Sequence, residues 1–439
     1  MNDIGGAPDP SRSLRISYLI QQFPVPTETF AVSDIAALIA EGHDVRVYTL
    51  KLPPRDEQSL LQQCGVSPQL AVFRPSWAGA RSWPALLWRR RRQAAWLAAQ
   101  ILPHWRSAPL PCAQALLCIP RLVEIADRLA SDGSAVVHAF WSRHVALVLP
   151  LLKVAGAPPL RSAFVGAYDL VADDFIFDIV APATEVMFSH AEVNRPFLER
   201  KACAGTAIDI VHRGIPLMDT IAAGSRDPFR LMTASALVES KNVDAVIRSF
   251  AATHERDGRL TLSIYGDGPD RQRLERLAKQ LGCAASITFA GHVSRVELFR
   301  HMERASIFIL LSKKPSERLP NVLKEALWAG CAVISSNSEG IDELLPDPSI
   351  GIVVDPDDRE AITAALESLL MESPQDGDRR RERTRAFVAE HFSSAASMRS
   401  YVRAWRTRIA MPRAPLEHGR AELAAHDPGF MTRRGPNQA

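Results

Sequence analysis

Short apolar runs alternate with longer segments of helical periodicity along most of the chain. The runs expected to form β-strands are 15–20, 44–50, 135–140, 185–189, 208–211, 229–233, 260–265, 286–289, 306–311, 331–335 and 350–354. Strands that alternate with helices pair in parallel and are covered by helices on both faces. The pattern therefore predicts an α/β protein with parallel sheets, in which ligands bind beyond the carboxyl ends of the strands.

The same pattern divides the chain into parts. Residues 219–228 read DTIAAGSRDP, a stretch of small and polar residues that is typical of a linker. The other predicted parts are a flexible N-terminus (1–13), a first α/β domain (14–218), a second α/β domain (229–392), a late helix (393–411) and a tail (412–439) whose Pro, Gly and Arg content predicts disorder.

The composition is that of an ordinary globular protein. The chain has 439 residues, enough for two domains with a core each, of which 47% are hydrophobic and 23% charged. The net charge of +3 does not point to a nucleic acid partner, and we expect none. Six cysteines without a CxxC spacing indicate reduced thiols in a cytoplasmic protein rather than disulfides or a metal site. We expect no metal and no cofactor.

We find no pattern of a signal peptide or a transmembrane helix. The first twelve residues are polar, without an apolar core. The longest apolar stretch, 145–160, is interrupted by prolines and Lys153 and is too short to cross a bilayer. Any membrane contact is therefore expected to be peripheral, on the inner face of the plasma membrane.

Residues 312–340 form the most informative segment, SKKPSERLPNVLKEALWAGCAVISSNSEG. A polar loop with Glu317 leads to Pro320, a start signal for a helix, and Gly330 is a stop signal before an apolar run. The apolar stripe of this helix leaves Glu325 on another side. We expect Glu325 to point to solvent or into a cleft, where it is free to bind a ligand.

The start of this helix suits an anion. Free backbone amides at Arg318, Leu319, Asn321 and Val322 would present a partial positive charge there, while Pro320 has no N–H. We therefore expect a phosphate or diphosphate group at this position.

The pair Glu317 and Glu325, with seven residues between them, resembles the signature of retaining glycosyltransferases of family 4. Further segments match that family in order: ISYLIQQFPVPTETFAVSDIAALIAEGHDVRVYTL (16–50), VHRGIPL (211–217), LVESKNVDAVIRSFA (237–251) and IYGDGPDRQRLERLA (264–278). The first of these segments is similar to the exopolysaccharide and colanic-acid branch.

The resemblance implies a glycosyltransferase B fold, in which two Rossmann-like domains face a cleft and helix 393–411 packs back on the first domain. It implies retaining transfer of a hexose from a UDP- or GDP-sugar to a polysaccharide or lipid-linked saccharide acceptor. Two alternatives stay open. One is a degenerate, non-catalytic member that binds nucleotide or scaffolds a polysaccharide-assembly complex, and the other is a nucleotide-sugar epimerase of the same fold.

For the second domain, the resemblance implies that Lys241 binds the donor phosphates. It also implies that Glu317 contacts hydroxyls of the donor sugar and that Glu325 holds the ribose hydroxyls. The alternatives are a solvated lysine at a helix start, a salt bridge within a loop and an exposed helix carboxylate.

Four further residues are assigned to nucleotide-sugar binding. Gly266 and Gly268 belong to a Gly-Asp-Gly-Pro turn that would lie near the base and the phosphates, although a plain turn explains the glycines nearly as well. Leu319 and Asn321 belong to the expected anion site at the helix start.

Three positions depart from the family pattern. Ala236 stands where the family has an Arg, Arg318 where it has a Gly, and Val165 where it has a His. Arg318 is accordingly assigned a catalytic role beside Glu317, in which its guanidinium replaces the missing cation at the diphosphate. The opposite hypothesis is that Arg318 obstructs a decayed site.

On the acceptor side, we single out Glu28 and Thr29 in the first strand-to-helix loop. His138 and Asp169 are expected to be polar groups at strand ends that face the cleft. The alternative for Glu28 is a first-turn helix residue, and for His138 and Asp169 it is a structural role.

Residues 74–112 depart from the strand and helix alternation. Five of the eight tryptophans lie here, around the run Arg89 to Arg92. Three interpretations stay open: a peripheral contact with an anionic membrane surface, which we favour, a helical insertion in the core with a solvated Arg face, and a nucleic acid contact.

Overall fold

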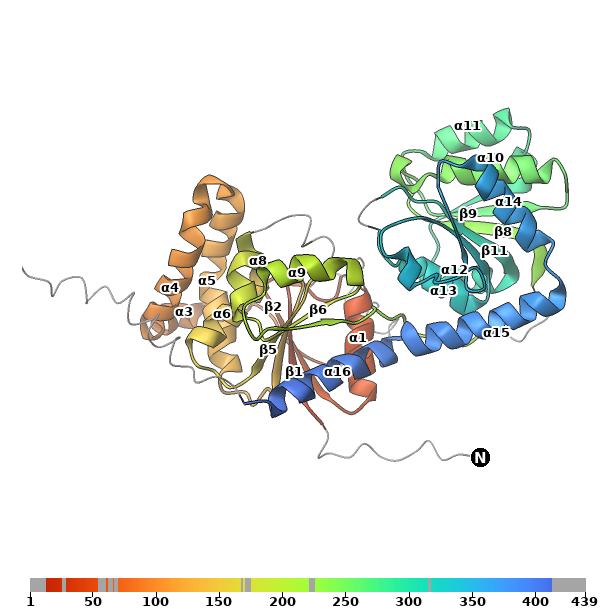
Figure 1. Ribbon diagram of the computed structural model, residues 1–439. Coiled ribbons are helices and arrows are strands. Elements are labelled where there is room, and N and C mark those ends of the chain that lie inside the picture. The colour runs from red at the N-terminus through yellow and green to blue at the C-terminus, as the bar shows by residue number, and fades with distance from the viewer. Residues whose placement is uncertain are drawn as a thin grey trace, which may run out of the picture. The chain divides into compact units, whose positions relative to one another are not determined.

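The structure is a computed structural model, shown in Figure 1. It describes residues 13–25, 29–53, 61, 66, 70–166, 169, 175–220, 226–314 and 317–412, apart from the side chains of Thr29, Trp77 and Ala78. The chain forms two compact units. Unit 1 comprises Met1–His190, Asn194–Val211 and Met398–Ala439, and unit 2 comprises Ala191–Val193 and His212–Ser397.

The two units do not divide at the predicted linker, 219–228. Residues 212–218, which the sequence pattern assigned to the first domain, belong to unit 2, because Ile215 is buried in its core. Residues 221–225 of that linker, most of the predicted N-terminal segment (1–12) and the predicted tail from 413 onward lie outside the described residues.

Unit 1 is built on a seven-stranded sheet with the order β3-β2-β1-β4-β5-β6-β7, in which all neighbours are parallel. The strands are β1 (Arg15–Ile20), β2 (Asp44–Thr49), β3 (Ala71–Phe73), β4 (Val136–Phe140), β5 (Leu160–Phe164), β6 (Val186–Ser189) and β7 (Ala207–Ile210). Leu19 faces one hydrophobic cluster while its neighbours Tyr18 and Ile20 face another. Both faces of the sheet are therefore buried, as the apolar runs predicted.

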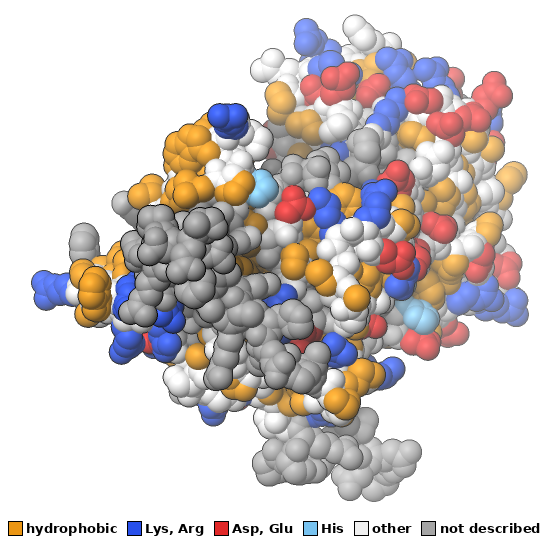
Figure 2. All heavy atoms as spheres, turned by 60° about the vertical axis from the view of Figure 1, so that its left-hand side comes forward, with side chains coloured by type: hydrophobic (Ala, Val, Ile, Leu, Met, Phe, Trp, Pro, Cys, Tyr) orange, Lys and Arg blue, Asp and Glu red, His pale blue; other side chains and the backbone are white. Residues whose placement is uncertain are grey.

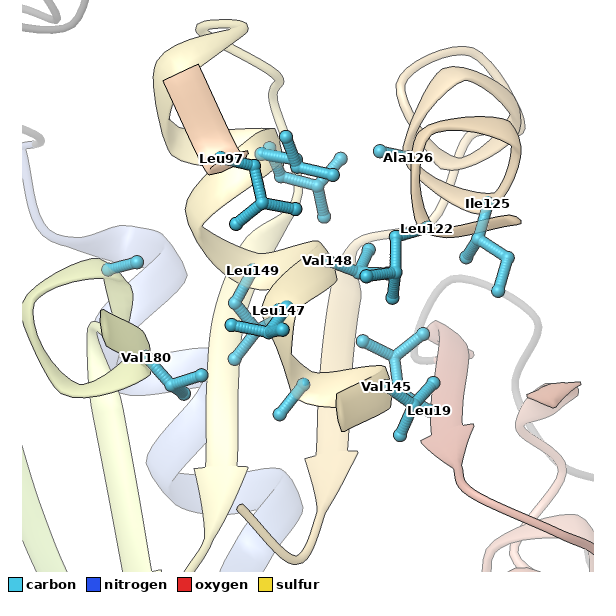
Figure 3. Packing of buried hydrophobic residues seen from close by; sticks show 14 of the residues in the cluster. Leu19, Leu97, Leu122, Ile125, Ala126, Val145, Leu147, Val148, Leu149 and Val180 are labelled. Carbon is cyan, nitrogen blue, oxygen red and sulfur yellow. The ribbon is translucent and has the colours of Figure 1, made fainter. Parts of the chain in front are cut away.

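Helices cover both faces of this sheet. The larger helices are α1 (Thr29–Ala40), α3 (Trp77–Arg89), α4 (Arg91–Ile101), α5 (Pro109–Leu129), α6 (Val148–Val154), α8 (Phe175–Val180), α9 (Arg195–Lys201) and α16 (Ser394–Ala410). On one face, side chains of α4, α5, α6 and α8 pack together on the sheet (Figure 3). The other face is covered by α1 and by α16 from Met398 onward.

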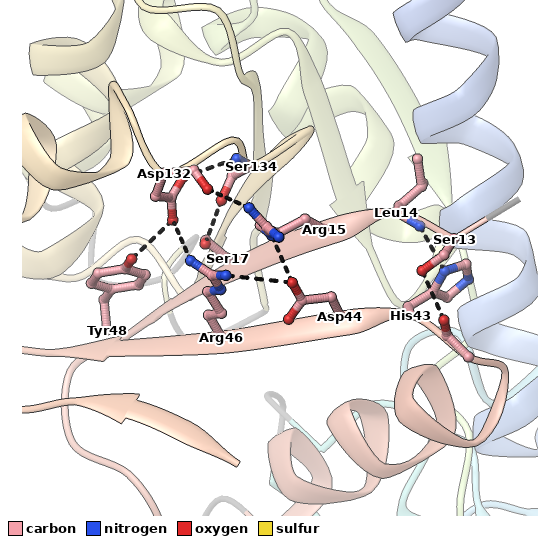
Figure 4. A network of polar contacts seen from close by, with 11 residues as sticks. Ser13, Leu14, Arg15, Ser17, His43, Asp44, Arg46, Tyr48, Asp132 and Ser134 are labelled. Carbon is pink, nitrogen blue, oxygen red and sulfur yellow. Dashed lines mark hydrogen bonds and ion pairs between the residues drawn. The ribbon is translucent and has the colours of Figure 1, made fainter. Parts of the chain in front are cut away.

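A polar network ties the loop before β4 to the first two strands (Figure 4). The Asp132 carboxylate accepts a hydrogen bond of 2.9 Å from the Tyr48 hydroxyl, and the Asp132 carbonyl accepts one of 2.6 Å from Arg15. Arg15 also binds Asp44, its register partner on β2, at 2.6 Å. Because Arg15 binds both Asp44 and the loop that carries Asp132, the network supports the register of β1 against β2.

Unit 2 contains a six-stranded parallel sheet with the order β10-β9-β8-β11-β12-β13. Its strands are β8 (Asp227–Ala234), β9 (Thr261–Tyr265), β10 (Ile287–Gly291), β11 (Ala305–Leu310), β12 (Ala332–Ser336) and β13 (Ile352–Val354). One face carries α10 (Val243–His254), α11 (Arg271–Gln280) and α14 (Arg359–Leu370), and the other carries α12 (Arg295–Arg304), α13 (Asn321–Ala329) and α15 (Pro374–His391) (Figure 1).

The predicted strands all form, with ends that differ by at most two residues from the apolar runs. Two strands were missed. β3 has only three residues. β5 has Arg161 as its second residue, and this charged side chain is only 5% exposed, where it binds the Ala183 carbonyl at 2.9 Å and Glu185 at 3.1 Å. A buried charge with partners inside the fold interrupts an apolar run that would otherwise mark a strand.

Helix α5 is the one helix in the described part of the chain with the length and apolar character needed to cross a membrane. Its buried residues, however, pack into the core of unit 1, among them Cys112, Ala115, Ile119 and Leu122. This packing is that of a core helix.

The C-terminal helix α16 closes the second hydrophobic cluster of unit 1. Trp405 is fully buried there, and its indole N–H donates a hydrogen bond of 3.0 Å to the Ser162 hydroxyl on β5. Tyr401 stacks on Phe188 of β6 with ring centroids 3.8 Å apart. Unit 1 therefore depends on a helix that follows unit 2 in the sequence.

We predict that Trp405→Ala lowers the free energy of unfolding of unit 1 by about 3–5 kcal/mol, because it leaves a large cavity and removes one of the two hydrogen bonds of the Ser162 hydroxyl. The matched control is Ile409→Ala, four residues along the same helix, where the side chain is 40% exposed. Urea unfolding would measure both. Equal effects of the two changes would contradict the assigned packing of α16.

Candidate functional site

The centre of the sheet in unit 2 brings two loops together at its carboxyl edge. Strands β8 and β11 are neighbours there, and the strand order reverses between them, which is where ligands bind in sheets of this type. The loop after β11 is held to the segment after β8 by a hydrogen bond of 2.8 Å from the Lys313 amide to the Ser240 carbonyl. The Ser336 hydroxyl, at the end of β12, donates to the Ser312 carbonyl at 2.6 Å.

Lys241 and Glu317 meet at this edge. Lys241 ends the short helix η7 (Glu239–Lys241), and its ammonium group forms an ion pair with Oε1 of Glu317. The side chains are only 16% and 17% exposed. The second oxygen, Oε2, is buried and has no hydrogen-bond partner among the described residues. A buried carboxylate oxygen without a partner is costly, so this atom is suited to accept a hydrogen bond from a ligand.

Asn242 fixes the direction of the chain directly after Lys241. It has a left-handed backbone conformation with φ of 53° and is the N-cap residue of α10. Its side-chain amide donates to the Pro356 carbonyl at 3.2 Å. Asparagine tolerates this conformation better than most residues, so it holds Lys241 in place at modest conformational cost.

The prediction that Glu325 points to solvent is wrong, while its place beside a ligand stays a prediction. Glu325 is 8% exposed, and its Oε1 accepts a hydrogen bond of 2.8 Å from the guanidinium of Arg295. Burial raises the pKa of Glu325, and the charge of Arg295 opposes that shift. Arg295 therefore determines how the Glu325 carboxylate is held and charged.

The apolar stripe of α13 suggested that only one side of the helix is buried. In the structure α13 is covered on more than one side, by α12, by α15 and by the sheet. Even Lys324 is 1% exposed, with its ammonium group donating to the Arg213 carbonyl at 2.7 Å and to Oδ1 of Asn321 at 3.1 Å. Asn321 thus has a structural contact at the helix start. The N-cap residue is Pro320, so no side chain caps the first-turn amides of α13.

The left-handed residue in this loop is Leu319, with φ of 47°, and not Arg318. Leu319 is 2% exposed, and a non-glycine residue in this conformation costs about 1–2 kcal/mol. Arg318 extends to Glu339, in the loop after β12, with an ion pair of 2.5 Å. Its guanidinium is therefore engaged by a carboxylate, and a diphosphate would compete with Glu339 for it.

Gly266 and Gly268 have a clear structural role. A Cβ atom at Gly266 would collide with the Ser235 carbonyl, and one at Gly268 would collide with the Leu237 carbonyl. Gly266 also has a φ of 116°, which side chains rarely adopt. The two glycines let the loop after β9 approach the loop after β8, which carries the exposed Ala236.

The residues predicted for the acceptor side lie in unit 1. His138 is 1% exposed in the middle of β4, where its Nδ1 lies 2.9 Å from the Ser162 hydroxyl, so the prediction of a strand-end group facing the cleft is wrong for this residue. The strand continues for two residues beyond it, and the aromatic rings of Tyr18 and Trp405 surround it.

The other acceptor-side residues stay predictions. Asp169 does follow a strand end, and its Oδ2 accepts a hydrogen bond of 2.9 Å from the Gly166 amide. Val165 is fully buried in an apolar cluster. Thr29 begins α1, and Glu28 lies outside the described residues.

Sequence reasoning missed Arg295 and Glu339. Arg295 is the first residue of α12, whose N-cap Ser294 accepts a hydrogen bond of 3.2 Å from the Glu297 amide. A cation at a helix start opposes the helix dipole. Arg295 directly follows the N-cap Ser294, a position that is unfavourable for a cation. This position was a signal in the sequence that Arg295 has a carboxylate partner, which is Glu325.

A hollow of about 540 Å³ lies at the opposite edge of the same sheet. It is lined by Arg226, Ser306 and Ala332, which belong to or precede the amino ends of β8, β11 and β12. The hollow is therefore separate from the residues described above. Among the described residues, no group of three or more His, Cys, Asp or Glu side chains could hold a metal ion.

Residues 222–387 match the family model for "Glycosyl transferases group 1". The GDP-mannose-dependent alpha-(1-6)-phosphatidylinositol monomannoside mannosyltransferase of Mycolicibacterium smegmatis is 33% identical over 141 residues, which are 31% of this chain and 37% of that protein. The putative colanic acid biosynthesis glycosyltransferase WcaL of Salmonella typhimurium is 22% identical over 80% of this chain and 90% of its own.

Solved structures agree on the fold. The structure of HepE from Anabaena in complex with UDP superposes with a TM-score of 0.63 and 13% sequence identity, over 90% of this chain and all of that one. Unit 2 is thus a glycosyltransferase domain in a protein of the glycosyltransferase B fold. These matches confirm the predicted fold class, and over the residues that the family model covers they agree with the predicted family and class of enzyme.

We predict that Arg295→Ala destabilises unit 2 by about 2–4 kcal/mol at neutral pH, because it leaves a buried carboxylate without its partner. The folded-state pKa of Glu325 lies above its unfolded value, so the folded protein binds this proton more tightly. Stability therefore falls as the pH rises from the unfolded pKa through the folded pKa, and Arg295→Ala should widen that window.

Thermal unfolding between acid and neutral pH would measure this effect. The double variant Arg295→Ala with Glu325→Gln should lose the added pH dependence, because no buried charge is left. A pH profile of the single variant that parallels the wild type would show that Glu325 is not the group concerned.

Proposed function

We propose that this protein transfers a hexosyl group, with retention, from a UDP- or GDP-sugar to a saccharide or lipid-linked saccharide acceptor. The observation that carries the proposal is the buried Glu317 carboxylate, which shares one oxygen with Lys241 and has no described partner for the other. It lies between the central strands of the domain that matches the family model.

The proposed chemistry needs stabilisation of a leaving nucleoside diphosphate. The bond between the anomeric carbon and the diphosphate oxygen breaks, the acceptor hydroxyl oxygen bonds to that carbon, and the hydroxyl proton passes to the leaving diphosphate. Negative charge builds up on the diphosphate as its bond breaks. Lys241 supplies a cation there, and the uncapped amides of α13 supply dipoles that are already oriented. These groups need no metal ion.

Two carboxylates would bind hydroxyl groups of the donor. Oε2 of Glu317 accepts a hydrogen bond from the sugar, and Glu325, oriented by Arg295, accepts one from the ribose. The names of similar proteins support both donor bases, since one relative is described as GDP-mannose-dependent and the HepE structure contains UDP. The lipid-linked acceptor and the peripheral membrane location stay predictions.

Nucleotide and nucleotide-sugar binding distinguishes these roles. We predict that Lys241→Ala weakens UDP or GDP binding about 10- to 100-fold, the equivalent of a charge-assisted hydrogen bond. Glu317→Gln should leave nucleotide binding close to that of the wild type but lower the affinity for the nucleotide sugar and the turnover. Lys279→Ala, at an exposed lysine on α11, is the matched control.

Isothermal titration calorimetry with UDP, GDP and their hexose derivatives would measure these affinities. Wild-type affinity in Lys241→Ala would overturn the placement of the diphosphate. Binding of nucleotide without sugar transfer to any saccharide acceptor would favour the non-catalytic alternative, which the departures at Ala236 and Val165 support.

The ion pair of Arg318 with Glu339 separates the two hypotheses for Arg318. If the guanidinium serves the diphosphate, Glu339→Gln should release it and raise donor affinity several-fold, and Arg318→Gly should lower turnover. Adding Ala236→Arg to Arg318→Gly should then restore part of the turnover, because the two cations would share a partner. A rise in donor affinity or turnover in Arg318→Gly alone would instead identify Arg318 as an obstruction.

A further inference from the structure

The arginine run that suggested a membrane contact is largely used within the fold. Arg89 and Arg90 both bind the Asp127 carboxylate, at 2.8 Å and 2.7 Å. Trp83 donates to Glu124 at 2.8 Å, and Trp96 is buried in the core. These side chains hold α3 and α4 on α5, so they serve the helical insertion that was one of the sequence interpretations.

Exposed apolar side chains gather instead around η3 (Leu102–Arg106) and the first half of α5. Leu102, Trp105, Leu110 and Leu117 are 52%, 46%, 68% and 81% exposed. Five of the thirteen large exposed hydrophobic side chains in the described residues lie between Trp88 and Leu117. Single exposed leucines are ordinary, but a group of them marks an interaction surface.

The helix geometry explains why this group cannot turn inward. Leu110 and Leu117 are seven residues apart on α5 and therefore lie on the same face, about 20° apart. The opposite face carries Cys112, Ala115 and Ile119, which are fixed in the core. We call Leu102, Trp105, Arg106, Leu110 and Leu117 the α5 corner.

The net charge of the insertion that carries the α5 corner indicates the kind of partner. Residues 77–129 contain eight arginines and two carboxylates, whereas the whole chain has a net charge of only +3. Both carboxylates are already bound. Glu124 pairs with Arg121 at 3.0 Å, and Asp127 pairs with Arg89 and Arg90. The remaining exposed arginines, among them Arg106, leave this insertion strongly positive.

Trp88 and Arg91 show the same combination at the other end of α4. The Arg91 guanidinium lies over the Trp88 ring, 5.3 Å from its centroid, and Trp88 is 74% exposed. Exposed tryptophan beside arginine suits the headgroup region of a bilayer, where the ring is amphipathic and the charge meets phosphate. Figure 2, which brings this side of the molecule forward, shows hydrophobic side chains grouped beside Lys and Arg side chains.

We propose that the α5 corner docks on an anionic lipid surface, with its leucines and Trp105 inserted at the headgroup level and the arginines of the insertion bound to lipid phosphates. The contact is peripheral, because the other face of α5 is committed to the core. The occupant is a bilayer rather than a second copy or another protein, since the clustered positive charge complements anionic headgroups.

Vesicle sedimentation with the full chain tests this proposal. The wild type should bind vesicles of phosphatidylglycerol and phosphatidylcholine, less at high salt, and bind pure phosphatidylcholine weakly. The variant Trp105→Ser, Leu110→Ser, Leu117→Ser should lose about tenfold or more of its partitioning, because it removes the inserted apolar area. Arg91→Ser with Arg106→Ser should reduce binding chiefly at low salt.

The matched control is Met371→Ser with Val296→Ser, which removes exposed apolar side chains from unit 2. It should bind vesicles as the wild type does. Nucleotide affinity should be unchanged in all of these variants, so failure of the docking proposal is distinguishable from failure of the proposed function. Hydrogen exchange should show protection of residues 102–117 on vesicles.

Three outcomes would overturn the proposal. They are a wild type that does not bind anionic vesicles, a triple variant that binds as well as the wild type, and a control that loses as much binding. Self-association of the wild type that the triple variant abolishes, without vesicle binding, would assign the α5 corner to a second copy of the chain.

Discussion

Both units depend on one constraint, which is that a parallel sheet covered by helices on both faces leaves no water beside its strands. Charged and other strongly polar side chains can then lie only beyond the strand ends or inside the fold with partners. Arg161 and His138 are of the second kind, because Glu185, the Ala183 carbonyl and the Ser162 hydroxyl satisfy them. Lys241 and Glu317 are of the first kind. The same burial that builds the core therefore concentrates usable charge at the carboxyl edge of the sheet.

At this edge, Lys241 pairs with one of the two oxygens of Glu317. The side chains of Lys241 and Glu317 are each less than one fifth exposed to solvent. If either charge were unpaired, its burial would lower the free energy of unfolding by several kcal/mol, so each side chain stabilises the other. A bound diphosphate would draw Lys241 toward itself and leave Glu317 with a second oxygen to satisfy. A sugar hydroxyl can supply that hydrogen bond, which nucleotide alone cannot. The ion pair thus gives a physical reason for the diphosphate and the sugar to bind together more favourably than either part alone.

Much of the fold was predictable from the sequence, because fully buried parallel strands appear as apolar runs. The runs located β8, β9, β11 and β12, and Gly330 marked the end of α13 as expected. What failed was any prediction that required knowing the neighbours of a side chain. Glu325 looked exposed because a helical stripe assumes one covering element, whereas α12, α15 and the sheet all pack on α13.

Pairing over long sequence separations was equally invisible in the sequence. The motif placed Lys241 and Glu317 in one domain but not in contact, and nothing local showed that Arg318 binds Glu339 or that Arg295 binds Glu325. The left-handed position falls on Leu319, one residue beyond the position at which the family pattern has Gly. A departure from a family pattern at one position is therefore a poor measure of strain until the backbone conformation of its neighbours is known.

The arginine run shows that unseen long-range pairing also affects predictions about the surface. In the sequence, Arg89 to Arg92 is the dominant feature of its segment, but Asp127 lies 37 residues beyond Arg90 and binds two of the four arginines. The leucines of α5 attract no notice in the sequence because they form part of a long apolar helix. In the folded protein the two groups change in importance. Arg89 and Arg90 are paired with Asp127, whereas Leu110 and Leu117 stay exposed. The free energy for attachment to a surface must come from what folding leaves unsatisfied, and here that is apolar area beside Arg106, in an insertion with several other exposed arginines.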